Sequence, residues 1–258
     1  MRGMRWVARS RLAEHRIYLP LARLVYPGRV VGGQTQMVID GFTRSGVTFA
    51  VVAFQMAQRS PVRLAHHLHA PAQILSATRR GIPTLVLIRD PEDAVLSAII
   101  REPYVTPDAA LRAYARFYTR VEASRSLVTV APFTQLTRDL GVVIREVNGR
   151  FGTSFDEFRH TEENVRQVFH VIEDRSRRPP WSAELGLFED GRIGFEEYRR
   201  AVAARSGQAL GALPETRVPR PSAAREALKE DLRHLVGRHR GLVARARGVY
   251  ETLVGSEP

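Results

Sequence analysis

The segment Met37-Val-Ile-Asp-Gly-Phe-Thr-Arg-Ser-Gly-Val-Thr-Phe49 decides the fold of this chain. A short apolar run at 37–39 predicts a buried strand, and a second apolar run at 47–56 predicts a helix. The turn between them, 41–46, has a glycine at each end. A strand, a glycine-bounded turn and a helix in this order present backbone N–H groups to a phosphate. The segment therefore predicts a phosphate-binding loop.

One position distinguishes this loop from that of the nucleotide triphosphatases. The spacing from Gly41 to Thr48 is G-x-x-x-x-G-x-T, but Val47 stands where those enzymes carry a lysine. Arg44, inside the loop, is the replacement cation, and its planar guanidinium suits phosphate or sulfate oxygens. The strongest strand signal in the chain ends in Arg89, not in a bare metal-binding aspartate. These residues favour a site that holds anions with arginines and without magnesium.

Strand and helix signals alternate along the chain. Apolar runs predict strands at 37–39, 62–66, 84–88 and 127–131. Periodicity and capping residues predict helices at 47–56, 70–80, 91–101, 107–123, 137–151, 161–175, 196–205 and 222–236. This alternation predicts an α/β fold of three layers, of the P-loop type, in which helices flank a central parallel sheet. In such sheets ligands bind beyond the carboxyl ends of the strands.

The chain is long enough for one hydrophobic core, and we expect a single domain over 1–258. Four parts are expected: an N-terminal lead-in at 1–35, a core with the phosphate loop at 36–176, a lid or insertion at 177–221, and a C-terminal helical segment at 222–258. Within the lid, 186–194 is expected to be irregular. Segment 7–24 of the lead-in is amphipathic and is expected to pack on the domain, although a basic amphipathic segment could also contact a membrane surface.

Composition narrows the function further. The chain has no cysteine, which excludes disulfides, thiol catalysis and cysteine-ligated zinc. It has no long uncharged apolar run and begins with a basic stretch that lacks an apolar signal core, so we expect no transmembrane segment and a cytoplasmic location. The net charge is +12, but Lys229 is the only lysine, the arginines are scattered, and no nucleic-acid-binding motif is present. We therefore expect no specific nucleic-acid partner.

Arg89 and Ser97 form a second candidate anion site. Ser97 lies eight residues after Arg89, about two turns along the helix that follows the strand. A guanidinium and a hydroxyl in this arrangement can grip a second phosphate. Two plainer interpretations remain open: Arg89 could pair with Asp93, and Ser97 could be a small packing residue.

A histidine cluster follows the short strand predicted at 62–66. A strand-end histidine beside a phosphate loop can act as a general base, which makes His69 and His67 candidate catalytic residues. A surface histidine cluster and a metal site are the alternatives. No distant motif completes a metal site, so no metal is predicted.

These three motifs in this order resemble those of the sulfotransferases that use 3′-phosphoadenosine 5′-phosphosulfate (PAPS). The family's loop commonly reads Pro-Arg/Lys-Ser-Gly-Thr-Thr, and here it is Thr43-Arg-Ser-Gly-Val-Thr48. The family's Arg-Asp/Asn-Pro followed by a serine matches Arg89-Asp-Pro91 with Ser97, and its Lys-Thr-His-x-Pro matches His67-Leu-His-Ala-Pro71. The resemblance covers about residues 36 to 150.

The resemblance implies a role for each matched position. PAPS would be the co-substrate, no metal would be needed, and the acceptor would be a hydroxyl or amine of a small molecule or glycan. The 5′-phosphosulfate would be held by Arg44, Ser45, Gly46, Val47 and Thr48. Arg89 and Ser97 would hold the 3′-phosphate. His69 would deprotonate the acceptor, Arg44 would stabilise the leaving phosphate, and a protonated His67 would replace the family's lysine.

Thr43, Val47 and His67 depart from the family pattern, so a divergent or inactive member is one open alternative. A nucleotide-dependent kinase with a divergent loop, and a non-catalytic nucleotide- or anion-binding relative, are the others. The acceptor is expected to be shaped by 103–118 and 181–198, which carry several aromatic residues. Two C-terminal arginines, Arg220 and Arg225, are interpreted as surface residues. The sequence specifies neither the acceptor nor the oligomeric state.

Overall fold

A central parallel sheet organises the protein. The computed structural model describes residues 1–177, 183–204 and 220–255. Their strands form one sheet in the order β2-β1-β3-β4, with β1 at Met37–Gly41, β2 at Leu64–His66, β3 at Thr84–Ile88 and β4 at Thr129–Pro132. Every neighbouring pair is parallel: β1 pairs with β2 and β3, and β3 pairs with β4. The predicted α/β fold with a central parallel sheet is confirmed.

Both faces of this sheet are buried, as the continuous apolar runs predict. Met37 and Ile39 of β1 pack in the same hydrophobic cluster as Leu85 and Leu87 of β3. The residues that alternate with them belong to clusters on the opposite face, Val38 to one and Val86 and Ile88 to another. The two-residue period of a strand therefore divides one apolar run between two cores, and the sheet becomes the middle of three layers.

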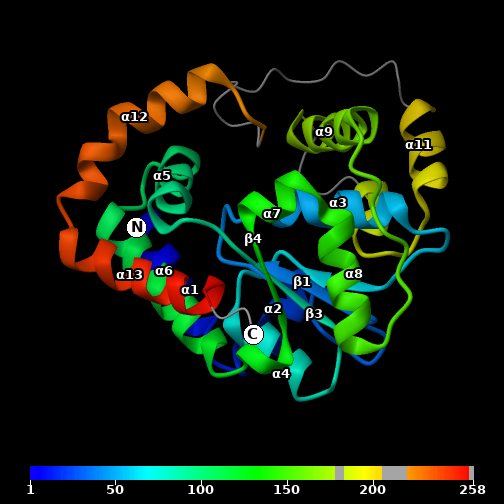
Figure 1. The fold of residues 1–258 in the computed structure, drawn as a ribbon, viewed down its shortest axis with the longest axis horizontal. Helices are drawn as coiled ribbons and strands as arrows, with labels where there is room; N and C mark the ends of the chain where they lie inside the picture. The colour runs from blue at the N-terminus through cyan, green and yellow to red at the C-terminus, as the bar shows by residue number, and fades with distance from the viewer. Residues whose placement is uncertain (178–182, 205–219, 256–258) are drawn as a thin grey trace.

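Helices cover the two faces (Figure 1). One face carries α3 (Val47–Ala57), α8 (Leu140–Phe151) and α9 (Glu162–Arg177), with α10 (Ala183–Glu189) and α11 (Phe195–Ala203) beside them. The other carries α4 (Pro71–Thr78), α5 (Pro91–Arg101), α6 (Pro107–Glu122), α12 (Ala223–Gly237) and α13 (Arg240–Val254). The lead-in forms α1 (Arg2–Leu12) and α2 (Tyr18–Val25), which pack on this second side. Two short elements flank β4, a 3₁₀ turn at Arg125–Leu127 and α7 at Phe133–Arg138.

Local capping fixes where several helices begin. The Asp90 side chain accepts a hydrogen bond from the Asp93 N–H at 3.1 Å, and Pro91 occupies the first helical position of α5. The Ser222 hydroxyl accepts from the Arg225 N–H at 3.2 Å at the start of α12. Both caps agree with the sequence prediction.

Two predictions of local structure need correction. The helix predicted at 137–151 is interrupted at Asp139, whose backbone is extended and whose Oδ1 caps α8 by accepting from the Gly141 N–H at 2.8 Å. The prediction of an irregular 186–194 is wrong in its first part, because α10 extends to Glu189 and buries Leu185 and Phe188 in the core.

The lead-in and the lid differ in how far the structure describes them. Trp6 of α1 is buried against α6, so the lead-in packs on the domain. The predicted lid falls partly on 178–182 and 205–219, including Trp181, and these residues lie outside the described ranges. Within those ranges, no helix combines the length and the apolar character needed to cross a membrane.

Candidate functional site

Every strand of the sheet delivers a residue to one cavity at its carboxyl edge. Arg44 follows β1, His67 and His69 follow β2, Arg89 follows β3, and Phe133 follows β4. These residues line a cavity of about 230 Å³. Parallel strands bring their carboxyl ends to one edge, so residues far apart in the sequence meet there. The arrangement unites three of the predicted motifs: the loop, the histidines and the arginine after β3.

The phosphate loop lines this cavity at the start of α3. Gly46 is the N-cap of α3 and adopts the left-handed conformation, with φ at 94°. The first N–H groups of a helix have no partner within that helix, and Gly46, Val47 and Thr48 all line the cavity. Backbone donors and the positive end of the helix dipole therefore face the space where an anion would bind.

Tyr118 holds the phosphate loop in place through hydrogen bonds. Its hydroxyl accepts a hydrogen bond from the Phe42 N–H at 3.1 Å and donates to the Leu87 carbonyl at 2.7 Å. It also lies 3.1 Å from the Ser45 hydroxyl, which is fully buried and does not line the cavity. Ser45 is thus placed to hold the loop's shape. No local sequence pattern indicates this role for Tyr118, because α6 reaches the loop only through the tertiary fold.

Ser97 joins two arginines behind the cavity. Its hydroxyl accepts from Nε of Arg44 at 2.9 Å and from a terminal nitrogen of Arg225 at 2.6 Å. Ser97 itself is fully buried and does not line the cavity, whereas both arginines do. Here the serine positions two guanidiniums that face the cavity.

The position of Arg225 differs from the sequence prediction. The sequence predicts a surface arginine at this position, but only 5% of Arg225 is exposed. The packing of α12 on α5 carries it inward to Ser97. Arg220 does remain largely at the surface, where it pairs with Glu173 while also lining the cavity.

Arg89 forms an ion pair with Asp93 at 3.1 Å, which was one of the two roles that the sequence allowed for it. It also lines the cavity. Its guanidinium lies over the Phe133 ring, 4.2 Å from the ring centroid. Its buried Nε has no hydrogen-bond partner among the described residues. A buried donor without a partner is costly, so this nitrogen favours an added acceptor.

The cavity carries a strong excess of positive charge. Five fixed cations line it, while its one carboxylate, Glu226, already binds Lys229 at 2.8 Å. Burial lowers the pKa of Arg44 to about 9, and the charges of Arg225, Arg101 and Arg89 contribute to the shift. The pKa of Arg225 is lowered by burial and then by Arg89. The guanidiniums therefore repel one another, and an anion between them would relieve that repulsion.

Three side chains at this cavity sit on strained backbone. Within the described ranges, the non-glycine residues with positive φ are Arg44, His67 and His69, at 71°, 55° and 50°. Such residues cost roughly 1–3 kcal/mol each and cluster at functional sites. The same three residues are the catalytic candidates of the sequence prediction, so the fold retains strain at the positions where chemistry is expected.

A chain of hydrogen bonds extends from the loop to a distant carboxylate. Thr48 Oγ1 lies 3.0 Å from His67 Nε2, His67 Nδ1 lies 2.6 Å from His66 Nδ1, and His66 Nε2 lies 3.2 Å from Asp190 Oδ1. An ionised carboxylate only accepts, so His66 donates to Asp190 and in turn accepts from His67. A further proton would then bind at His67 Nε2, which faces Thr48. Sequence reasoning missed Asp190, since it follows α10 in the segment expected to be irregular.

The same histidines do not form a good metal site. Ligand atoms of His66, His67 and Glu189 lie within 4.8 Å of one another, so the fold supplies the distant partner that the sequence lacked. However, two nitrogens bound to one tetrahedral zinc ion would be roughly 3.3 Å apart, given bonds of about 2.0–2.1 Å. The Nδ1 atoms of His66 and His67 lie only 2.6 Å apart. Arg29 also lies 3.6 Å from Glu189. The geometry fits a shared hydrogen better than a metal ion.

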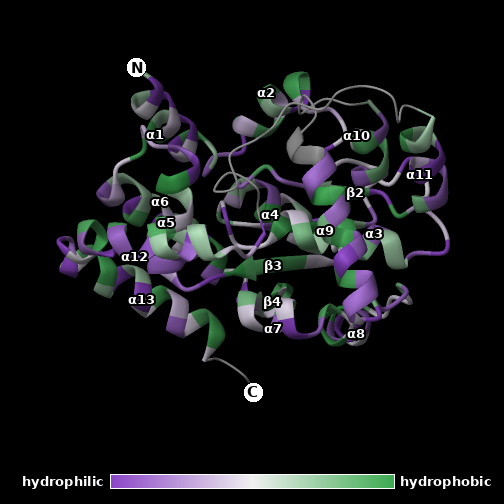
Figure 2. Ribbon diagram, turned by 90° about the horizontal axis from the view of Figure 1, so that it is seen from above, coloured by the Kyte–Doolittle hydropathy of each residue, from purple (hydrophilic) through white to green (hydrophobic). Residues whose placement is uncertain are grey.

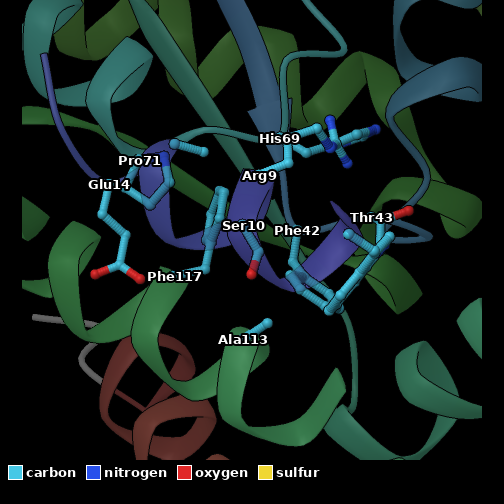
Figure 3. A pocket seen from close by; sticks show the side chains of 11 residues that line it. Arg9, Ser10, Glu14, Phe42, Thr43, His69, Pro71, Ala113 and Phe117 are labelled. Atoms are coloured by element: carbon cyan, nitrogen blue, oxygen red, sulfur yellow. The ribbon is translucent and has the colours of Figure 1, made fainter. Parts of the chain in front are cut away.

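His69 lies where two cavities meet. Together with Thr43 it lines both the arginine-rich cavity and a second, smaller one. Figure 3 shows Phe42, Thr43 and His69 on one side of the second cavity and Glu14 and Pro71 on the other. Its volume of about 20 Å³ has room for a water-sized group.

The tautomer of His69 follows from its contacts. Nδ1 lies 2.8 Å from the Gly41 carbonyl oxygen, which can only accept, so Nδ1 carries the hydrogen. Nε2 is then the basic nitrogen of the neutral ring. The backbone N–H of His69 donates to both carboxylate oxygens of Asp40, at 3.2 and 3.1 Å. Asp40 therefore holds the strained backbone that aims the ring.

The two segments expected to shape an acceptor site, 103–118 and 181–198, lie in different surroundings. Ala113 and Phe117, from 103–118, line the second cavity. In 181–198, the described aromatics Phe188 and Tyr198 are buried in the core with their ring centroids 5.0 Å apart. Those two aromatics therefore contribute core packing, while Asp190 and Arg192 of the same segment line a separate cavity of about 230 Å³.

Comparisons with known proteins add little to this geometry. No protein-family model and no curated protein sequence matches the chain. Among solved structures, the chain is similar to the crystal structure of mouse sulfotransferase SULT7A1 complexed with PAP, with a TM-score of 0.41 and 11% sequence identity. The match covers 83% of this chain and 95% of that one. A likeness at this level carries no argument, and the functional inference rests on the site itself.

Asp40 should make stability depend on pH. Burial raises its pKa from 3.8 to about 7, against the opposing effect of hydrogen bonds from Gly41, His69 and Gln73. The folded protein therefore binds this proton more tightly than the unfolded chain. Its contribution to stability is complete below pH 4 and is lost as the pH rises to 7, by up to about 4 kcal/mol.

Urea unfolding of the wild type and of Asp40→Asn at several pH values measures this contribution. The difference between their unfolding free energies should change steeply between pH 4 and 7 and level off above that range. Nδ1 of His69 lies 3.5 Å from Oδ1 of Asp40, so Asp40→Asn should be compared within a His69→Gln background as well. A difference that stays constant across the range would contradict the raised pKa.

Proposed function

We propose that this protein is a sulfotransferase that moves a sulfuryl group from PAPS to a hydroxyl or amine of a small molecule or glycan. The observation that carries the proposal is the convergence of Arg44, Arg89 and Arg225 on one cavity beside a helix N-terminus. Three guanidiniums with so little compensating acid suit a ligand with several negative charges. A nucleotide with phosphates at both its 3′ and 5′ ends is such a ligand.

The loop would bind the 5′ end of the donor. Backbone N–H groups at Gly46 and Val47, with the guanidinium of Arg44, suit a phosphosulfate at the start of α3. Because donation comes from the backbone, the valine at 47 is compatible with binding. Arg89 and Arg225 are left for the 3′-phosphate, and Ser97 holds Arg225 in place.

His69 would act as the general base. The acceptor oxygen attacks sulfur while the bond from sulfur to the bridging phosphate oxygen breaks, and Nε2 of His69 takes the acceptor's proton. Charge then collects on the departing 5′-phosphate, where Arg44, the loop amides and a protonated His67 can stabilise it. The second cavity, which His69 also lines, has room for a hydroxyl-sized group.

Binding of 3′-phosphoadenosine 5′-phosphate (PAP) tests the proposal directly. Thermal unfolding without magnesium should show a large rise of the midpoint with PAP and a smaller one with ADP, because ADP lacks the 3′-phosphate. At a PAP concentration of about 100 Kd the stabilisation should be roughly 2.7 kcal/mol. Arg89→Ala and Arg225→Ala should each bring the PAP response down toward that of ADP.

Arg145→Ala is the matched control, because Arg145 forms an exposed pair with Glu157 and neither residue lines the cavity. It should leave both responses unchanged. The absence of any shift at millimolar PAP would contradict the proposal. Equal responses to PAP and ADP would favour a protein that binds ordinary nucleotides.

A further inference from the structure

The N-terminal helices expose an unusual amount of apolar surface. Among the described residues, nine large hydrophobic side chains are exposed, and seven of them fall within the first 25 residues: Met1, Met4, Leu12, Ile17, Leu21, Leu24 and Val25. An eighth, Tyr104, lies beside Met4 and Leu12 in a surface groove of about 770 Å³. Scattered exposed hydrophobics are ordinary, but a concentration of this kind marks an interaction surface.

The second helix is apolar on two sides. Tyr18, Leu19 and Ala22 of α2 pack inward on the domain. Ile17, Leu21, Leu24 and Val25 follow the spacing of one helical face and point outward, with Leu24 83% exposed. A helix that is hydrophobic all round is normally buried. The outward face of α2 is therefore suited to an apolar environment that the chain itself does not supply.

The same region is strongly basic. The first 25 residues contain six arginines and a single acid, Glu14. That carboxylate is already bound by Arg116 at 2.7 Å and lies 3.6 Å from Arg120, both on α6. The surface of α1 and α2 thus combines apolar side chains with an excess of arginines over the acids of the same segment. Figure 2 shows the two helices along the same edge of the molecule, near the N-terminus.

We propose that α1 and α2 dock on an anionic lipid bilayer. Apolar side chains among arginines are the composition of helices that lie in a membrane interface, where the side chains enter the acyl boundary and the guanidiniums meet the headgroups. A second copy of the chain fits less well, because a symmetric contact would set six arginines against six. A nucleic acid would match the charge but not the apolar stripe.

Co-sedimentation with vesicles tests the docking without any enzyme assay. We expect the full chain to partition about tenfold more strongly into phosphatidylcholine vesicles that contain phosphatidylglycerol than into phosphatidylcholine alone, and less strongly as salt is raised. The double variant Leu21→Glu/Leu24→Glu changes only exposed side chains, so it should fold normally and lose about tenfold or more of this partitioning.

Matched controls separate the surface from general stickiness. Leu127→Glu changes an exposed hydrophobic residue outside the region and should bind as the wild type does. Arg5→Ala/Arg16→Ala should weaken binding to anionic vesicles, whereas Arg79→Ala/Arg80→Ala, after α4, should not.

Three outcomes would overturn the proposal. The first is equal binding by the wild type and the Leu21/Leu24 variant. The second is equal binding to neutral and anionic vesicles. The third is failure to bind vesicles together with a dimer, seen by sedimentation equilibrium, that the Leu21/Leu24 variant converts to a monomer. That result would assign the surface to a second copy of the chain.

Discussion

Replacing His69 with asparagine should lower kcat for sulfuryl transfer about 10²–10⁴-fold, the usual contribution of a positioned general base. His69 is the histidine that lines both cavities, and its bond to the Gly41 carbonyl leaves Nε2 as the basic nitrogen. Asparagine tolerates the left-handed backbone at φ 50° better than alanine, so the change removes the base with little added strain. Transfer from PAPS should be measured with a panel of hydroxyl and amine acceptors.

His67→Asn is the matched comparison for this substitution. His67 has a similar left-handed backbone but contacts Thr48 and lines only the arginine-rich cavity. We expect it to weaken PAP binding, whereas His69→Asn should leave PAP affinity within a few-fold of the wild type. If the His69 variant kept most of its activity while the His67 variant lost it, the base would have to be reassigned to His67.

Replacing Gly46 with alanine should lower PAP affinity about 10- to 100-fold. At φ 94° a side chain is strained, at roughly 1–3 kcal/mol. A Cβ there would also lie 2.6 Å from Leu136 and 3.1 Å from the Phe133 ring, the ring on which Arg89 rests. The substitution should therefore disturb the loop amides and an arginine together. Calorimetric titration with PAP measures the loss.

Gly81→Ala is the control for backbone strain alone. Gly81 also has a positive φ, 65°, but nothing lies within 4 Å of its added Cβ. This variant should lose about 1–2 kcal/mol of unfolding free energy and bind PAP normally. A Gly46 variant that bound PAP as tightly as the Gly81 variant would show that the loop is not the binding element.

The parts of the fold predicted correctly were those with local signals. Glycines bounded the phosphate loop, Asp90 and Pro91 started α5, and uninterrupted apolar runs gave β1 and β3. The break at Asp139 was missed because helical periodicity continues across it. The helix α10 was missed because Gly186 and Gly194 suggested a loop, while the burial of Phe188 depends on tertiary packing.

In the candidate site, too, residues within local motifs could be predicted and residues placed by tertiary packing could not. Arg44, His69 and Arg89 could be proposed because each stands in a recognisable motif at a strand end. Arg225 could not, since the sequence of α12 resembles an ordinary solvated helix and only its packing on α5 brings the arginine to Ser97. Asp190 and Tyr118 are likewise separated from their partners by long stretches of chain, with no local pattern to connect them.

The arginine cluster has a practical consequence for the choice of buffer. Guanidiniums that suit a nucleotide phosphate also suit inorganic phosphate and sulfate. In a phosphate buffer, Arg44, Arg89 and Arg225 would be partly occupied before any nucleotide is added. A titration under those conditions measures displacement of the buffer ion, and its apparent Kd rises with the buffer concentration. Work in an amine buffer with chloride as the counterion avoids competition from phosphate and sulfate, and crystals grown from ammonium sulfate would start with the site filled.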